Sequence, residues 1–478
     1  MSISLALSLT VLIIPSTLLV HLLWAPKNAL ACSLPIKIFL GAGLGFGMSS
    51  VFLFLWLIVF GSLSQTYVVA ETLLALLTVV SLFYMSRRFV IQSSNAVVTT
   101  KSTTPNLSLF TSIVLLVSAA CIFVTALVTR AREPHGQGDA TAIWNLIARF
   151  VFRGGHEWSD TLTHRLAWTH SDYPLLLPLS VARMWAYANE TQVAPILIAL
   201  IFTFGTLGLL VSSTSLLRTR TQGYLAGLVL LEPFLFFRIG TYQYADTPLG
   251  FFLLALLVLF CLYDKSPPEG RGLLILAGMM TGFAAWTKNE GLLILLAVVI
   301  GRVIAVTLSQ NLRTCLIQMV YFAVGVVPSL SVVAYFKIAI APANDLVAGQ
   351  SLGATSKRLL DFSRYVTIVR AFVNQLTGFR KWYLHPTYLL VIYAWLLGVK
   401  VDRSERTSIL TLSTALGLIL AGYFFTYVTT PRDLAWQLTF SLDRLLIQLW
   451  PSLVFFYFLL VDSPEKAIAA KKLRASTT

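Results

Sequence analysis

Two aspartates in this chain are placed where a carboxylate could do acid–base chemistry. Asp139 lies in a polar stretch of about sixty residues, from Arg130 to Glu190, long enough to indicate a functional loop, and Asp246 directly precedes a long apolar segment. Asp139 follows Gly138 and could be a helix N-cap, or a general base or metal ligand at a membrane surface. Asp246 could cap a helix with Pro248 in its first turn. A structural and a chemical interpretation therefore stay open for both.

Further charged residues lie beside other apolar segments, at ends expected on the same side of the membrane as Asp139 and Asp246. An ionisable group near membrane depth is costly enough to indicate function by default. His170 and Asp172 lie later in the polar stretch that contains Asp139. The residues beside the other segments are Glu232, Arg238, Lys288, Glu290, Asp433, Asp443 and Arg444.

The composition determines which elements must position these residues. Of the 478 residues, 57% are hydrophobic and 12% are charged, and the mean hydropathy is +0.80. Soluble chains carry about 25% charged residues, so this chain has too few to cover a water-facing surface. The sequence predicts an all-α polytopic membrane protein and excludes a soluble one.

A helix that crosses the ~30 Å hydrocarbon core needs about 20 mostly apolar residues. We expect thirteen such helices, of which the eighth and ninth are nearly fused around Lys288. Their approximate ranges are 3–24, 36–62, 66–86, 108–129, 191–213, 221–239, 245–263, 271–287, 290–308, 314–341, 384–399, 408–430 and 441–461.

The distribution of basic residues predicts the orientation of these helices. If the N-terminus is outside, eighteen Lys and Arg residues fall on the inner side and only four in short outer loops. Short cytoplasmic loops collect Lys and Arg, so we expect an external N-terminus and a cytoplasmic C-terminus. The net charge of +15 is then largely a matter of topology and does not indicate a nucleic-acid partner.

Five regions follow from this map. They are an N-terminal four-helix membrane region (1–129), an external loop with interfacial helices (130–190), a central membrane core (191–341), a second external loop (342–383), and C-terminal helices with a cytoplasmic tail (384–478). We expect a surface helix from Asp139 onward, with Asp139 as its N-cap. The second loop is either an interfacial amphipathic segment or a flap over the site. Four glycines in the second span are expected to form a helix-packing face rather than a nucleotide site: Gly41, Gly43, Gly45 and Gly47.

Several short motifs, taken in order, resemble those of integral-membrane glycosyltransferases of the C-type (GT-C) fold. The most similar groups are bacterial relatives of protein O-mannosyltransferases and of the aminoarabinose transferase of lipid A, as in glycosyltransferase family 39. The resemblance covers roughly 130–460. It departs from the family in the four spans before the acidic loop, in Ala140 where many relatives have a second acid, and in the single Pro174. The motifs are Gly138-Asp139, His170-Ser-Asp172-Tyr-Pro174-Leu, Tyr244-Ala-Asp246-Thr-Pro-Leu, Thr287-Lys288-Asn-Glu290-Gly and Ser441-Leu-Asp443-Arg444.

The resemblance implies an enzyme that moves a sugar from a polyprenyl-phosphate carrier to a hydroxyl of a glycan, lipid or protein acceptor. The reaction would take place at the external face of a membrane, in a bacterium the inner membrane. Asp139 would be the general base and Asp246 a second catalytic carboxylate. His170, Asp172 and Glu290 are candidates for substrate binding.

The phosphate of such a donor needs positive charge because negative charge builds on it in the transition state. Lys288, Arg238 and Arg444 could supply it. No cofactor is certain; a divalent cation held by Asp139 and Asp246, with help from His170, is the alternative.

Two other functions have a similar outline. An O-antigen ligase or polymerase also uses a large external loop, but takes its glycan from a diphosphate carrier. A transporter is the third possibility, although transporters typically show internal repeats and ionisable residues near the midplane, whereas the charged residues here cluster at the outer ends of the predicted spans.

Overall fold

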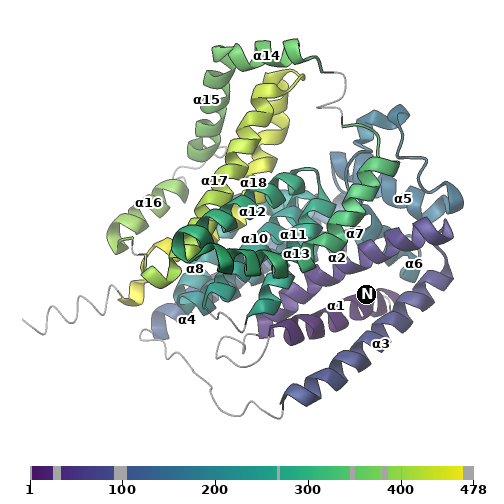
Figure 1. The fold of residues 1–478 in the computed structure, drawn as a ribbon, viewed down its shortest axis with the longest axis horizontal. Helices are drawn as coiled ribbons and strands as arrows, with labels where there is room; N and C mark the ends of the chain where they lie inside the picture. Colours follow the sequence, from purple (N-terminus) through teal and green to yellow (C-terminus); the bar gives the residue numbers. More distant parts are fainter. Residues whose placement is uncertain are drawn as a thin grey trace, which may run out of the picture.

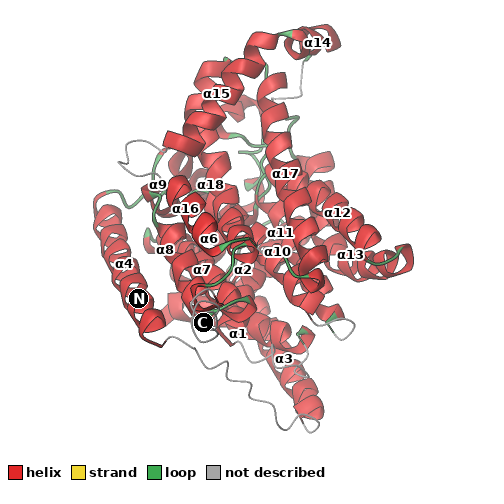
Figure 2. Cartoon of the chain, turned by 90° about the vertical axis from the view of Figure 1, so that its left-hand side faces the viewer, coloured by secondary structure: helices red, strands yellow, loops and turns green. Residues whose placement is uncertain are grey.

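The computed structural model describes residues 3–24, 34–90, 105–265, 270–344, 350–378, 386–399 and 401–466. Within these ranges the chain forms helices joined by turns and loops, and it contains no strand (Figure 2). The predicted all-α architecture is therefore confirmed. Part of the predicted cytoplasmic charge lies outside the described residues: Lys27, Lys101, Lys400, Lys471, Lys472 and Arg474.

Ten helices in the described part of the chain are long and apolar enough to cross a membrane. They correspond to ten of the thirteen expected spans, so the chain is a multi-pass membrane protein by length and composition of its helices. The ten are α1 (Ile3–Leu23), α2 (Leu34–Phe60), α3 (Gln65–Val90), α4 (Pro105–Arg132), α7 (Val193–Leu217), α10 (Asp246–Lys265), α12 (Glu290–Ser309), α13 (Leu312–Tyr335), α17 (Arg406–Thr429) and α18 (Leu434–Leu460).

The expected count of thirteen spans is not confirmed. The segment 221–239 is divided into α8 (Arg220–Leu231) and α9 (Phe234–Thr241), which are bent by 73°. Pro233 lies at this break. It interrupts the helix because proline has no N–H to donate to the preceding turn. Two further helices are shorter, α11 (Arg271–Thr287) with 17 residues and α16 (Pro386–Leu397) with 12. Ten helices thus qualify among the described residues, or eleven if the bent pair is one span.

Helix α10 lies at the centre of the bundle, with its apolar window entirely buried. It packs against α7, α11 and α18 (Figure 1). The glycines of α2 form the packing face that was expected. A Cβ at Gly45 would lie 2.5 Å from Leu12 of α1, and one at Gly43 would overlap Phe251 of α10. Small residues let these backbones approach closely.

The segment expected to be the first external loop, residues 130–190, folds as a set of short helices docked on the N-terminal spans. It contains a π-helical turn (Ala140–Trp144), α5 (Asn145–Arg153) and α6 (Leu176–Ala188). Arg183 of α6 is fully buried, and its Nε donates to both carboxylate oxygens of Glu71 in α3, at 2.8 and 2.9 Å. The buried pair fixes this segment on α3, because separating its partners would leave an uncompensated charge.

The segment expected to be the second external loop, residues 342–383, contains α14 (Leu352–Leu360) and α15 (Phe362–Gly378), which extend along and beyond one end of α17 and α18 (Figure 1). Arg364 donates to the carbonyl of Tyr427 at 2.9 Å, and Arg358 to that of Thr429 at 3.2 Å. These bonds satisfy carbonyls that the C-terminus of α17 leaves without a partner. Both helices are amphipathic, as expected; whether they lie on a membrane or over the site stays a prediction.

Candidate active site

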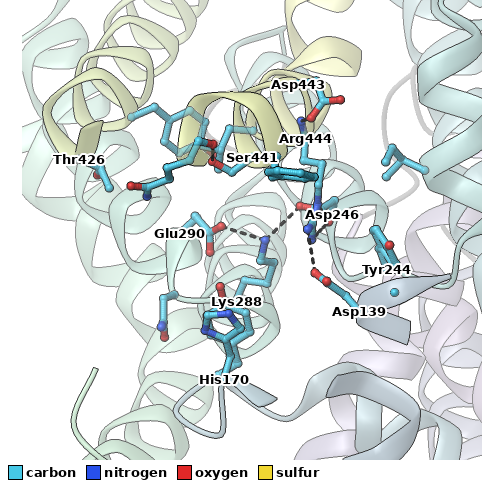
Figure 3. A pocket seen from close by; sticks show the side chains of 18 of the residues that line it. Asp139, His170, Tyr244, Asp246, Lys288, Glu290, Thr426, Ser441, Asp443 and Arg444 are labelled. Atoms are coloured by element: carbon cyan, nitrogen blue, oxygen red, sulfur yellow. Dashed lines mark hydrogen bonds and ion pairs between the residues drawn. The ribbon is translucent and has the colours of Figure 1, made fainter. Parts of the chain in front are cut away.

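A cavity of about 780 Å³ brings together seven of the eight residues predicted to form the site. Its walls come from two parts of the 130–190 segment, from the α9–α10 and α11–α12 connections, and from one end of α17 and α18 (Figure 3). Segments distant in sequence therefore meet in one cavity. The seven are Asp139, His170, Arg238, Asp246, Lys288, Glu290 and Arg444.

Asp246 is the buried anchor of the cavity, with 0% of its surface exposed. Its Oδ1 lies 3.0 Å from Lys288 Nζ and accepts a 2.6 Å hydrogen bond from Gln448 Nε2. Its Oδ2 lies 2.8 Å from Arg444 Nη2. Tyr423 in turn donates to Gln448 Oε1 at 2.7 Å and fixes the orientation of that amide. Because a buried charge is tolerated only when it is paired and hydrogen-bonded, Asp246 acts as the anion that holds two cations in place.

Arg444 joins Asp246 to Asp139. Its Nε and Nη2 face Asp246 Oδ2 at 3.2 and 2.8 Å, and its Nη1 lies 2.7 Å from Asp139 Oδ2. The guanidinium carbon lies 4.7 Å from the centre of the Tyr244 ring. A planar guanidinium has several N–H donors in fixed directions, so one side chain can hold both carboxylates.

The position of Arg444 differs from the prediction. Helix α18 begins at Leu434 and not at 441, because the carboxylate of Asp433 accepts the N–H of Trp436 at 2.7 Å and caps the helix. Arg444 therefore lies within the helix, where its side chain reaches the cavity wall, and not at the end of a span.

Asp139 is not the helix cap that its position after Gly138 indicates. It precedes the π-helical turn but makes no side-chain cap hydrogen bond, and its carboxylate lies against Arg444. The side chain is 32% exposed and lines the cavity. The N-cap interpretation is wrong because the ion pair takes the carboxylate away from the helix N-terminus. Single π turns occur frequently at functional sites.

Close backbone approach places Asp139 near the α9–α10 connection. Gly136 has a φ of +79°, and a Cβ there would lie 2.8 Å from the carbonyl oxygen of Tyr242. Glycine is required here both for its conformation and for the contact. Burial, followed by the nearby carboxylate of Asp139, raises the pKa of Tyr244 to about 12, so this phenol stays neutral beside the carboxylate at ordinary pH.

The turn between α11 and α12 places Lys288 between two carboxylates. Its Nζ lies 3.0 Å from Asp246 Oδ1 and 2.8 Å from Glu290 Oε1. Burial alone would lower the pKa of Lys288, but Asp246 and then Glu290 outweigh it and hold the pKa above its usual value. Gly291 permits the turn, because a Cβ there would overlap the carbonyl of Ala284 in α11. Lys288 is therefore a permanent cation in the cavity.

His170 lies at the end of a stack of three rings. Its ring is 5.0 Å from that of Tyr173 at an interplanar angle of 10°, and Tyr173 is 5.6 Å from Trp144 at 15°. The backbone of His170 has a φ of 48°, a conformation that residues other than glycine adopt rarely. Burial raises the pKa of Tyr173 above its ordinary range. The stack presents His170 as a flat ring at the cavity wall.

Asp172 lies behind the wall of the cavity and does not line it. Its Oδ2 accepts hydrogen bonds of 2.7 Å from Asn289 and from Asn344, and lies 3.6 Å from Lys337 Nζ. Asn289 and Asn344 do line the cavity. Asp172 therefore does not face the cavity, contrary to the expectation for a substrate-binding residue, but fixes the amides of Asn289 and Asn344.

Arg238 of α9 is the cation least compensated by the protein. It lines the cavity, and its guanidinium carbon lies 5.8 Å from the Tyr242 ring. Within the described residues it has no ion pair, and its buried Nε has no hydrogen-bond partner. Such a group favours an anionic ligand. Glu232, considered with it from the sequence, lies at the break between α8 and α9 and does not line the cavity.

Sequence reasoning missed several residues that shape the site. Gln448 carried a signal, since a polar side chain inside an apolar span is unusual. Tyr423 carried none, because tyrosine is common in membrane helices and loops, and Tyr173 stood inside a quoted motif without a predicted role. Asn289 and Asn344 become recognisable only through their contact with Asp172.

The cavity is continuous with an apolar surface of α18. Trp436 and Phe440 line it, yet they are 49% and 60% exposed, and their rings are 5.5 Å apart. Arg432 lies 5.9 Å from the Trp436 ring. A polar cavity therefore adjoins a surface suited to hydrocarbon.

The geometry does not fit the divalent cation proposed for Asp139 and Asp246. Both carboxylates face the guanidinium of Arg444, and Lys288 is bound to one of them. The described residues contain no group of three or more His, Cys, Asp and Glu side chains that could hold a metal ion. A divalent ion placed between the two aspartates would meet Arg444 at short range, which Coulomb repulsion opposes.

Comparison with known proteins adds no identity to this arrangement. No protein-family model, curated protein or solved structure matches the chain.

Proposed function

We propose that the chain is a membrane glycosyltransferase of GT-C-like fold that transfers a sugar from a polyprenyl-phosphate carrier to an acceptor hydroxyl. The observation that carries this proposal is the pairing, in one cavity, of an accessible carboxylate with fixed cations next to an exposed apolar surface. Asp139 is the carboxylate, Lys288 and Arg444 are the cations, and Trp436 and Phe440 mark the surface.

The proposed reaction uses these groups as follows. The acceptor oxygen attacks the anomeric carbon of the sugar and forms the new glycosidic bond, while Asp139 takes the hydroxyl proton. The bond between the anomeric carbon and the phosphate oxygen breaks, and polyprenyl phosphate leaves with the electron pair. Lys288, Arg444 and Arg238 stabilise the charge that builds on this phosphate.

Asp246, Gln448 and Tyr423 hold the cations and do not meet the reacting atoms. Asp246 pairs with Lys288 and Arg444 from a fully buried position. Charges that are already fixed in place stabilise a transition state without reorganising at the moment of reaction. Asp246 therefore increases the reaction rate by holding the two cations in position. No step depends on a metal ion, since the carboxylates face cations already.

The lipid tail of the donor leaves the cavity over Trp436 and Phe440 in this proposal. Their exposure and apolar character support a lateral opening to the hydrocarbon core. The charge asymmetry supports an orientation with the cavity outside and the C-terminus in the cytoplasm, and the family resemblance supports a bacterial inner membrane. In a cysteine-free background, a Ser356→Cys variant on α14 should react with a membrane-impermeant maleimide in intact cells. Labelling only after permeabilisation would indicate the opposite orientation, with α14 on the cytoplasmic side.

A transfer assay tests the function. The purified protein is supplied with polyprenyl-monophosphate sugars and an envelope extract as acceptor, and transferred sugar is measured. Asp139→Asn should lower the rate by about 10²-fold or more, whereas Glu133→Gln, an equal charge change at a residue with a 45% exposed side chain, should not. Transfer from diphosphate donors alone would indicate a ligase or polymerase. Sugar flux into proteoliposomes without bond cleavage would indicate a transporter.

A further inference from the structure

We propose that the donor phosphate frees Asp139 by taking over the Nη1 group of Arg444, so that the base becomes available only when the donor is bound. The inference rests on the proposed function, which assigns a polyprenyl phosphate to this cavity. It concerns the ion pair of 2.7 Å between Arg444 Nη1 and Asp139 Oδ2 (Figure 3).

The charges that line the cavity favour such an exchange. The lining contains four acidic and four basic side chains, so it has no positive surplus with which to receive a phosphate. Arg238 can receive the phosphate first because it has no ion pair among the described residues, and a second cation reaches the phosphate by turning from a carboxylate. The acidic residues are Asp139, Asp246, Glu290 and Asp443, and the basic residues are Arg238, Lys288, Arg432 and Arg444.

The two contacts of Arg444 differ in how easily they are broken. Asp246 is fully buried and is held by Lys288 and Gln448 as well as by Arg444. Taking the guanidinium from it would strain a buried cluster. Asp139 is 32% exposed, and Arg444 is its only ion-pair partner among the described residues. A partly exposed pair is weaker because water screens it, so the phosphate competes for Nη1 and not for the edge that faces Asp246.

The fork geometry of the guanidinium allows this exchange without movement of the helix. Nε and Nη2 stay on Asp246 Oδ2, at 3.2 and 2.8 Å, while Nη1 changes partner. Arg238 has no ion pair within the described residues and serves as the first contact of the phosphate. Both oxygens of Asp139 then become available to an acceptor hydroxyl.

This arrangement predicts that the donor binds before the acceptor is activated. Without the phosphate, Arg444 occupies the carboxylate that would accept the proton. A hydroxyl or water that enters alone meets a carboxylate whose Oδ2 is already paired with Arg444. Arg444 thus binds the leaving phosphate and, by doing so, releases Asp139 to accept a proton.

Lipid-phosphate affinity tests the exchange directly. Undecaprenyl phosphate is titrated into the purified full-length protein in detergent, and its dissociation constant is measured for wild type and variants. Asp139→Asn should bind it about fivefold more tightly, because the phosphate no longer has to displace a charged carboxylate from Arg444. Asp443→Asn removes the same charge from the same cavity and should change affinity by less than about twofold.

A second background tests whether Arg444 mediates the effect. In Arg444→Lys, which keeps a cation for Asp246 but lacks the fork, the gain from Asp139→Asn should disappear. A gain that persists there, equal gains for Asp139→Asn and Asp443→Asn, or no gain at all would overturn the exchange. Failure of the wild type to bind undecaprenyl phosphate would overturn the proposed function itself. Wild-type binding without the predicted gain would overturn only the exchange.

Discussion

Asp139 and Asp246 come from different elements, yet a single guanidinium, that of Arg444, bridges them at 2.7 and 2.8 Å. One carboxylate is 32% exposed at the cavity surface and the other is fully buried. The contact therefore couples a carboxylate that lines the cavity to one that is buried in the protein interior. This division of roles separates chemistry at Asp139 from structural support at Asp246.

The two aspartates should differ in their effect on stability. Asp246→Ala leaves Lys288 and Arg444 without their buried partner and should lower the free energy of unfolding by about 3–5 kcal/mol. Asp139→Ala should cost less than about 1 kcal/mol because its pair is partly exposed. Chemical denaturation in detergent measures both. Equal losses would contradict the division of roles.

Gly291 should tolerate no side chain. A Cβ there would overlap the carbonyl of Ala284, so Gly291→Ala should separate α11 from α12 and lower the free energy of unfolding by about 1–3 kcal/mol. Transfer should fall as well, since the neighbouring Lys288 would move away from Asp246. Gly417 in α17 has open space around it and provides a matched Gly→Ala control. An unfolding midpoint unchanged in both variants would show that α11 and α12 can accommodate a Cβ at position 291.

Arg238 should contribute to donor binding more than to folding. Arg238→Gln removes a cation that has no ion pair among the described residues, so the KM for the donor should rise roughly tenfold, the value of one charged hydrogen bond. The melting temperature should stay close to that of wild type. Lys357→Gln, on the exposed helix α14, is the control for loss of a positive charge. An unchanged KM for the donor would show that Arg238 does not bind the phosphate.

Glu190 predicts a specific pH dependence of stability. Burial favours its neutral form, but hydrogen bonds from Arg153 and Arg149, at 2.6 and 3.1 Å, outweigh this and lower its pKa below the ordinary value of 4.5. A carboxylate whose pKa is lowered in the folded state stabilises the protein at pH values above its ordinary pKa. That stabilisation is lost as the pH falls through the folded-state pKa. Thermal unfolding of wild type and Glu190→Gln should therefore differ by a constant amount at neutral pH and converge below about pH 4. A difference that persists in acid would assign the effect to packing.

The membrane character and most of the helices could be predicted from the sequence because both depend on local composition. Ten of the thirteen expected spans are helices of sufficient length. The error at 221–239 arose because hydropathy does not register the direction change at Pro233. The error at 441 arose because the cap at Asp433 precedes the apolar run.

The grouping of the site residues was predicted in part, through short motifs expected to face one side of the membrane. Their individual roles were not. Asp139 was expected to cap a helix or act as a base, and only its contact with Arg444 decides against the cap. Asp172 was expected in the site but lies behind Asn289 and Asn344.

The sequence by itself thus determined that this chain is a helical membrane protein with charged residues gathered at the ends of particular spans, because apolar length and residue type suffice for both. Only the tertiary structure decided which charges neutralise one another. That choice depends on distances of about 3 Å between Asp246, Lys288 and Arg444, and so on how α10, the α11–α12 turn and α18 pack together. No local pattern encodes those distances.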